Sequence, residues 1–558
     1  MLAPPAVQEA PWCPQQLRVP REDRTLFARP RLADGLAIGR QNHETLADAV
    51  SPIQGRAFSV LRTWTRAEAV RLARKYTEEL IGQSIPDEPA ELLWVGGHQP
   101  ALFHPGVWVK NFALAELAAR SGGVGLNLVI DNDILTSRRI RVPMGECSKP
   151  TMESVPFDAD SKAAPWEEAR VVDRSIFDSF DERIVKKMAH WGVVPIASEM
   201  WPDAVRHLDH SPFLRDALTA ARSRMERRWG ATNLELPLSQ LCETEPFLWF
   251  ASHLFATLPQ FREIYNAVLL EYRNVNHVRS KNHPVPELRS QEGWLEAPFW
   301  IWREGDRLRK RLMVLREGKQ VQLSDGHEVF ATLPLPVDGE ACCAVEVLRK
   351  LPEQGIRLRT RALTTTLFTR LFLSDHFVHG IGGSKYDEIT DRIITRFYRL
   401  PAPPFQTLSA TLHPPLAKPF DVSESDETRL RGLLRDIEFN PERHLNSGFN
   451  ADVDALLSEK AALIAEQHAV WNDSPKPRRV RRALMRSNYA RHQRFQQINN
   501  RLAAFATEQR RRMQDELDST RRQLAANAVL QDRTLSFCIY PEEKLRSFMR
   551  HLWDLPER

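Results

Sequence analysis

A turn that contains two histidines and several glycines lies between a short apolar run, 92–95, and a helical pattern, 107–120. A glycine turn that opens a helix presents backbone N–H groups and the positive end of the helix dipole to an anion. Imidazoles beside it can stabilise charge on a transferring phosphate. The alternative is a packed turn whose histidines bond to carbonyl groups. The GxxxxGK[ST] pattern of a P-loop is absent. The candidate residues here are Gly96, Gly97, His98, Gln99 and His104.

Asp131, Asn132 and Asp133 follow the next apolar run, 125–130. Ligands gather at the carboxyl ends of parallel strands, where carboxylates can hold Mg²⁺, a ribose or a substrate amine. The alternative is an Asx turn that caps a helix. We therefore expect Asp131 and Asp133 to be catalytic and Asn132 to contact a ligand.

A second glycine-rich turn begins at His379 and leads into another helical pattern. Its glycines allow close backbone approach, Lys385 would neutralise a phosphate, and Asp387 would orient an amine or hydroxyl. The alternative is an ordinary helix start favoured by acidic residues. The candidate ligand contacts are His379, Gly380, Gly382, Gly383, Tyr386 and Asp387.

The elements that must position these residues indicate a mixed α/β fold. Strand, helix and strand within 92–130 predict a βαβ unit with parallel strands, and 297–326 predict an antiparallel meander. Helices are expected at 65–80, 213–229, 246–278, 428–437, 451–471 and 480–530. The last of these should pair with 451–471 in an antiparallel coiled coil, after a break at Ser474–Pro477. We divide the chain into a lead-in and first core part (1–160), a mainly helical insertion (161–285), a β-meander (286–350), a second core part with a Pro-rich linker (351–420) and a C-terminal coiled coil with a closing helix (421–558).

Composition excludes several classes of protein. The chain carries a net charge of +5, and its apolar runs are too short to span a membrane. The N-terminal residues do not predict a secretory signal, so we expect a cytoplasmic protein. The six cysteines form no CxxC pair, which argues against a disulfide framework and a structural zinc site. The basic tract Arg478–Arg482 could contact nucleic acid, but we favour a solvated helix face.

Several segments together resemble the cysteine ligases of bacillithiol biosynthesis. The resemblance is carried by Gly96-Gly97-His98-Gln99, Asp131-Asn132-Asp133, Thr360-Arg361-Ala362-Leu363, His379 to Tyr386 and Tyr540 to Lys544. Their order and spacing agree over nearly the whole chain. Gln99, Asp131, Asp133, Arg361, Gly380, Gly382 and Tyr386 match that family's pattern. His98, Asn132 and Gly383 stand where the family carries Gln, His and Glu.

The resemblance implies a Rossmann-like core with helical and β-meander insertions and a C-terminal antiparallel coiled coil. It also implies a carbon–nitrogen ligase that joins an amine to a carboxylate on a small molecule, in the manner of low-molecular-weight thiol biosynthesis. ATP or another nucleotide, with Mg²⁺, would then be the cofactors, and Arg361 would contact substrate or nucleotide. The coiled coil would support a homodimer.

A non-catalytic reading also fits the sequence. The core would bind a metabolite, and the basic coiled coil would mediate assembly or nucleic-acid contact. Nucleotide binding at the His98 turn would favour the enzyme, whereas salt-dependent retention on nucleic acid would favour the scaffold.

Overall fold

The computed structural model describes residues 9, 12, 17–87, 91–306, 308–445, 451–471 and 478–557. Two compact units divide the chain. The first contains residues 1–144, 152–415 and 533–558, and the second contains residues 145–151 and 416–532. The segment 421–558, expected from sequence as one part, is divided between the two units. Its last residues, 533–558, belong to the first unit.

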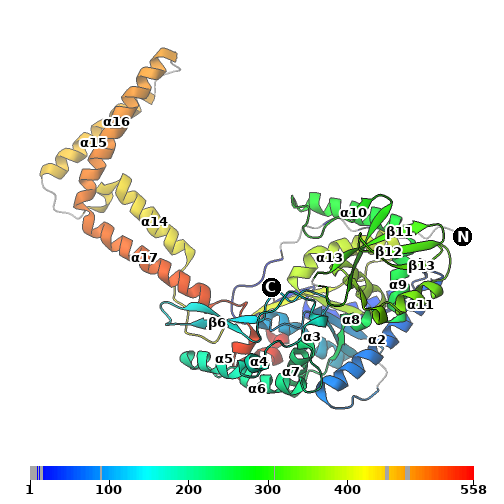
Figure 1. Cartoon of the computed structure of the whole chain (residues 1–558). Coiled ribbons are helices and arrows are strands. Elements are labelled where there is room, and N and C mark those ends of the chain that lie inside the picture. The colour runs from blue at the N-terminus through cyan, green and yellow to red at the C-terminus, as the bar shows by residue number, and fades with distance from the viewer. Residues whose placement is uncertain are drawn as a thin grey trace. The chain divides into compact units, whose positions relative to one another are not determined.

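Figure 1 shows the elements of the chain as a ribbon. The first unit is built on a six-stranded sheet. Its strands are, in spatial order, β1 (Thr25–Arg29), β16 (Gln406–Thr411), β15 (His376–His379), β4 (Leu93–His98), β5 (Val124–Val129) and β8 (Leu234–Pro237). All neighbours are parallel except β1, which pairs antiparallel with β16. The parallel βαβ unit expected at 92–130 is therefore confirmed, with α3 (Pro105–Ser121) as its helix.

Both faces of this sheet are covered, which explains why β4 and β5 contain short apolar runs without alternation. Val95 and Leu128 belong to one large core cluster with α2 (Phe58–Ile81), α9 (Glu245–Ala256) and α10 (Leu258–Val275). Trp94 points to the other face. Its ring lies against α1 (Gly35–Ala47), where a Cβ at Gly39 would come within 2.5 Å of it.

A second sheet is antiparallel and contains the expected meander. Its strands are, in spatial order, β13 (Val329–Pro334), β12 (Gln320–Ser324), β11 (Lys310–Glu317), β10 (Trp294–Arg303) and β14 (Ile356–Thr360), with β9 (Ser290–Gln291) beside β10. Short two-stranded sheets are formed by β2 (Pro52–Ile53) with β3 (Arg56–Ala57), and by β6 (Arg139–Met144) with β7 (Thr151–Pro156).

Helices make up about 53% of the chain, so the fold is mixed α/β. The remaining helices of the first unit are α4 (Arg174–Asp178), α5 (Phe180–Met188), α6 (Ala197–His207), α7 (Leu214–Arg228), α8 (Leu238–Leu241), α11 (Cys342–Arg349), α12 (Ala362–Phe368), α13 (Ile381–Ile393) and α18 (Glu542–Arg550). Helices α12 and α13 each continue into a short π-helical segment, Thr369–Leu373 and Ile394–Tyr398.

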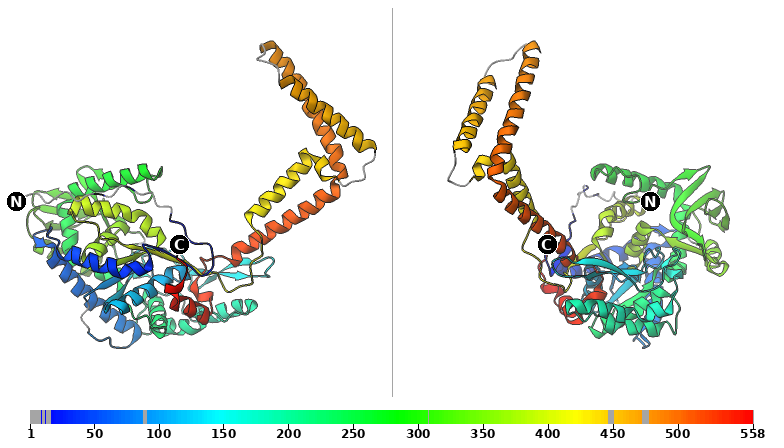
Figure 2. Two further views of the ribbon diagram at one scale, coloured as in Figure 1. Left: turned by 180° about the vertical axis from the view of Figure 1, so that it is seen from behind. Right: turned by 60° about the vertical axis from the view of Figure 1, so that its left-hand side comes forward.

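The second unit consists of α14 (Glu424–Phe439), α15 (Ala451–Trp471), α16 (Arg478–Phe505) and α17 (Thr507–Leu530). Helices α15 and α16 lie side by side, as do α14 and α17 (Figure 2). Val453 and Leu456 of α15 pack against Ile498 and Leu502 of α16. The break expected at 474–477 lies outside the described residues.

Three sequence expectations need correction. The helix expected at 480–530 is two helices, because the chain turns at Ala506, where the apolar stripe slips phase. The helix expected at 246–278 is likewise divided at Thr257. Strand β8 was missed inside the mainly helical segment 161–285, since four residues are too few to show a period. Among the described helices, none combines the length and apolar character needed to cross a membrane.

Candidate functional site

The carboxyl ends of β4, β5 and β15 meet at one edge of the parallel sheet. Val378 pairs with Gly96, and His98 pairs with Val129. His98 and His379 are the last residues of β4 and β15, and Asp131 to Asp133 follow β5. The structure therefore brings the two glycine turns and the Asp-Asn-Asp segment to the same edge, although 280 residues separate the two histidines along the chain.

His98 is held by a polar network that runs beneath the edge. Its Nε2 lies 3.2 Å from Oδ1 of Asn111, and its Nδ1 lies 2.9 Å from the carbonyl oxygen of Gln99. The amide nitrogen of Asn111 donates to Glu226 at 2.7 Å, so the oxygen of Asn111 is the atom that faces His98. Burial, with the positive charges of Lys110 and Arg222, holds the pKa of His98 well below its ordinary value.

Both atoms that face the His98 ring are thus acceptors. A neutral imidazole has one N–H and can satisfy only one of them, whereas an imidazolium would satisfy both. An anion bound nearby would offset the charge of Lys110 and favour the imidazolium. His98 is therefore suited to take up a proton when an anion binds.

Lys110 is the functional candidate that the sequence interpretation missed. It lies on the buried face of α3 with 4% of its surface exposed, and its Nζ donates to the carbonyl oxygen of Gly97 at 3.0 Å. Burial lowers the pKa of Lys110 to about 8. The signal was available in sequence: a lysine interrupts the apolar stretch Val107–Phe112 one turn after the glycine turn. Lysine is almost never buried unless it is paired or functional.

His379 faces Lys110 from the neighbouring strand end. Burial, followed by the charges of Lys110 and Arg370, lowers the pKa of His379 to about 3. Its Nε2 is buried and has no hydrogen-bond partner among the described residues. The carboxylate of Asp387, which is fully buried, lies 4.0 Å from this nitrogen and 3.3 Å from Nη1 of Arg370. Burial raises the pKa of Asp387.

Gly383 is required by the position of the His379 ring. A Cβ at residue 383 would stand 1.6 Å from Cε1 of His379, so only glycine fits. Nothing lies within 4 Å of the corresponding positions at Gly380 and Gly382. The second glycine turn therefore contains one glycine fixed by packing and two that leave open space in front of the helix.

A cavity of about 530 Å³ opens beside the ends of β4 and β5. Polar groups enter it from Gln99, Asp133 and Arg309. The amide nitrogen of Gln99 donates to Asp133 at 2.8 Å, and Nη1 of Arg309 lies 3.1 Å from the other carboxylate oxygen. Apolar walls come from Leu102, Ile134, Leu135, Ile140, Phe157 and Trp166. Thr136, Ser137 and Arg139 also line it, so polar and apolar side chains contribute about equally. A concave cavity with apolar walls and convergent polar groups is typical of small-molecule sites.

Asp131 and Asn132 have structural partners. The carboxylate of Asp131 is fully buried, forms an ion pair with Arg215 and accepts a hydrogen bond from the Ser239 amide at 2.9 Å. Asn132 donates to the carbonyl oxygen of Thr360 at 2.8 Å, which fixes the segment after β5 to the end of β14. Of the three residues, Asp133 alone lines the cavity.

Arg361 and Arg309 both stack on Trp300, at 5.0 and 4.9 Å from its ring. Arg361 also donates to the buried carboxylate of Glu296 at 2.6 Å. The Arg361 guanidinium is therefore held by a carboxylate and a ring, and it supports Arg309 at the wall of the cavity through the shared Trp300. Arg309 and Glu296 carried no sequence signal, because Glu296 lies on β10 and Arg309 directly precedes β11, both far from the turns in sequence.

The other predicted residues are more dispersed. His104 is the N-cap residue of α3, and a Cβ at the nearby Gly106 would lie 2.1 Å from the Ala410 carbonyl oxygen of β16. Tyr386 lies close enough to Asp387 and Asp133 for their charges, after burial, to raise its pKa to about 12. The side chain of Lys385 is exposed on α13.

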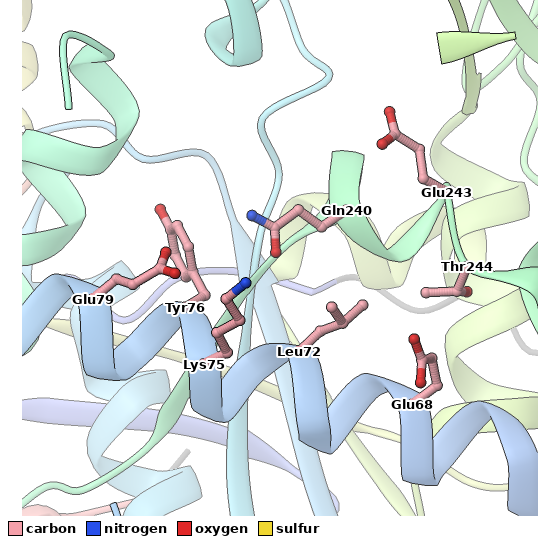
Figure 3. Close-up of a pocket in the computed structure, with 8 residues that line it drawn as sticks. All are labelled: Glu68, Leu72, Lys75, Tyr76, Glu79, Gln240, Glu243 and Thr244. Atoms are coloured by element: carbon pink, nitrogen blue, oxygen red, sulfur yellow. The ribbon is translucent and has the colours of Figure 1, made fainter. Parts of the chain in front are cut away.

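A second cavity, of about 320 Å³, lies between α2 and the segment after α8 (Figure 3). Lys75 of α2 points toward Gln240 across it and Glu68 points toward Thr244, whereas Glu243 points away from α2. Its main acids have local partners, since Arg71 donates to Glu68 and Arg359 donates to Glu243.

Mg²⁺ has no preformed site at these strand ends among the described residues. No group of three or more His, Cys, Asp or Glu residues there could hold a metal ion. The oxygens of Asp131 are already used, and Asp133 alone is a poor ligand set for Mg²⁺. These residues therefore do not form the set of oxygen ligands that Mg²⁺ requires.

Comparison with known proteins supplies no relative: the chain matches no model of a known protein family, and no curated protein matches it.

Proposed function

We propose that the protein is a carbon–nitrogen ligase that joins an amine to a carboxylate on a small molecule, with nucleotide activation. The observation that carries the proposal is the meeting of His98, Lys110 and His379 at the carboxyl edge of the parallel sheet, beside a cavity of about 530 Å³. A buried lysine and two partly buried histidines at one edge would hold the negative charge of a phosphate or carboxylate.

The proposal includes a Rossmann-like identity for the core. In chain order the parallel strands are β4, β5, β8, β15 and β16, and across the sheet they run β8-β5-β4-β15-β16. This is the 3-2-1-4-5 order of doubly wound folds, in which ligands bind where the strand order reverses. Here the reversal lies between β4 and β15, the strands that end in His98 and His379.

Each residue has a role in this proposal. Lys110 attracts the anionic group, the neutral His379 ring donates an N–H to it, and His98 takes up a proton as that group binds. Asp133, positioned by Gln99 and Arg309, holds the amine in the cavity. The orphaned Nε2 of His379 is the group whose chemistry best fits a phosphate oxygen. A bound nucleoside triphosphate would supply a phosphate leaving group for activating the carboxylate.

Calorimetric titration with ATP, ADP and AMP tests the binding part of the proposal. The wild-type chain should bind at least one of them, and Lys110→Met should weaken that binding by about tenfold or more, since a desolvated charge-assisted hydrogen bond contributes about 1.5–3 kcal/mol. Lys75→Met is the matched control, because Lys75 lines the second cavity and not the first. Equal losses in the two variants, or none in Lys110→Met, would contradict the assignment.

Turnover can be tested without a known substrate. Wild-type protein is incubated with ATP and pooled amine and carboxylate metabolites, and release of ADP or AMP is measured. His98→Ala should lower the rate by about 10²–10³, the usual effect of removing one positioned donor. An unchanged rate in His98→Ala would remove His98 from the catalytic role.

An assembly role is the second candidate, and the second unit supports it. We propose that α15 and α16 form an antiparallel coiled coil that pairs two copies of the chain. The helix pair is supported by the apolar contact of Val453 and Leu456 with Ile498 and Leu502 within one chain. The exposed aromatic side chains of Tyr489 and Phe505 are the surface proposed to meet the second copy. Side chains of Arg478–Arg482 lie outside the described residues. Light scattering of Tyr489→Ser should report a smaller species than wild type.

A further inference from the structure

Cys342 and Cys343 form a pair of adjacent thiols at the start of α11. Both side chains are exposed, and their Sγ atoms lie 3.9 Å apart. Helix α11 buries its other face through Ala344, Val345 and Leu348. The two cysteines therefore have no packing role on the helix, unlike Cys242 and Cys538, which are buried.

We propose that Cys342 and Cys343 together bind one thiophilic monovalent cation, Cu(I), through both sulfur atoms. This site is independent of the ligase-like site at the strand ends. Thiolates are the soft ligands that select Cu(I), and this ion accepts two or three sulfur ligands.

The sulfur separation favours a shared ion. Two sulfurs that each lie about 2.3 Å from a common metal, as thiolates do, are 3.9 Å apart when the bond angle is about 115°. This angle fits a three-coordinate Cu(I) ion whose third position is taken by a small thiol from solution. The pair can therefore bind one ion without any change in the helix backbone. Each sulfur would release its proton on binding.

A disulfide between the two cysteines fits the geometry less well. The sulfurs would have to approach from 3.9 Å to about 2.05 Å. The Cα atoms of adjacent residues are about 3.8 Å apart, which is shorter than the usual range of about 4.4–6.8 Å in disulfides. Such a bond would open the first turn of α11.

The number of ligands selects against zinc. A structural zinc ion takes four ligands, and no group of three or more His, Cys, Asp or Glu residues is found where the structure describes the chain. Glu346 lies near enough to Cys343 to help raise the pKa of its thiol, although Cys342 is the main cause. With two sulfurs on an exposed helix turn, the bound ion would remain open to exchange.

The test uses the full chain, reduced and kept anaerobic, with Cu(I) supplied from a coloured competing chelator. Wild-type protein should withdraw one Cu(I) per chain, and Cys342→Ser and Cys343→Ser should each weaken retention by about tenfold or more. Cys147→Ser is the matched control, because Cys147 is a partly buried single thiol, and it should behave as wild type.

Circular dichroism would check that the serine variants stay folded, which is expected for exposed positions. The proposal is overturned if Cys342→Ser keeps wild-type copper retention, or if the wild-type chain withdraws no copper. A third result would also overturn it: a mild disulfide oxidant forms a 342–343 disulfide in the wild-type protein, and both Cys342→Ser and Cys343→Ser retain copper as the wild type does.

Discussion

Lys110 places an ammonium group on the buried face of α3, and burial makes that charge costly. Its pKa falls from 10.5 to about 8, so the folded chain binds this proton less tightly than the unfolded chain. Each pKa unit corresponds to about 1.4 kcal/mol. The penalty is complete below pH 8 and disappears as the pH rises toward 10.5. A residue kept at such a cost is a strong functional candidate.

We therefore expect Lys110→Met to stabilise the protein while it weakens nucleotide binding. The gain at pH 7 should be about 2–3 kcal/mol, after loss of the bond to Gly97 is allowed for. The gain should shrink by about 1 kcal/mol or more at pH 9, because wild-type Lys110 is then largely neutral in the folded state. Urea unfolding at the two pH values measures both quantities. A destabilised Lys110→Met variant would indicate a structural lysine.

Asp131 and Asp133 should separate clearly in a stability measurement. Asp131→Ala would leave Arg215 buried without its main partner and should cost about 3 kcal/mol or more. Asp133 is 39% exposed, so Asp133→Ala should change stability by less than about 1 kcal/mol. Only the second variant should retain the fold and lose ligand affinity. Urea unfolding and calorimetry on both variants check this, and similar stabilities would contradict the division of roles.

The positions of the site residues could be predicted from sequence, but the partners of their buried side chains could not. Glycine turns mark strand ends, so His98, His379 and Asp133 were found by their places in the chain. Whether a carboxylate is free depends on partners far away in sequence. Arg215 pairs with Asp131 across 84 residues and Arg309 reaches Asp133 across 176, and neither pairing leaves a local pattern.

At the scale of elements, α13 shows how a glycine can be fixed by a neighbouring strand. Gly383→Ala should destabilise the protein by about 1–3 kcal/mol, because the new Cβ would overlap the His379 ring. Gly382→Ala is the matched control one residue earlier. Nothing lies within 4 Å of its Cβ, so the higher helix propensity of alanine should stabilise by about 0.5–1 kcal/mol. Thermal unfolding of the two variants should therefore shift in opposite directions, and a shift in the same direction would contradict the packing argument.

Long, periodic elements were predictable, and short or interrupted ones were not. The helix at 65–80 and the meander at 297–326 were expected because several periods of pattern are present in each. Strand β8 has four residues and is buried between β5 and helices, so it carries no alternation. The break between α16 and α17 left a phase slip in the sequence, but its conversion into a turn depends on packing within the second unit.

At the scale of the whole molecule, the chain leaves the first unit at Pro415 and returns at Arg533. The returning segment is part of the core. Phe537 donates its backbone N–H to Phe103 at 2.8 Å, and the Tyr540 hydroxyl donates to Leu412 at 2.9 Å. Both side chains are buried. Residues 533–558 therefore complete the first unit, although the second unit separates them from it in sequence.

Two deletions should consequently behave differently. A chain that ends at residue 415 loses these contacts and several buried aromatic side chains, each of which contributes about 1.5–3 kcal/mol to stability. Because a whole domain is stable by only about 5–15 kcal/mol, this chain should not fold. A chain in which a short Gly-Ser linker joins residue 415 to 533 should fold, since Arg533 donates to the Ala410 carbonyl at 2.6 Å and the two ends are close. Circular dichroism and nucleotide titration measure the outcome. If both deletions fold equally well, residues 533–558 are dispensable for folding. If the linked chain folds but does not bind the nucleotide that the full chain binds, residues of the second unit contribute to binding.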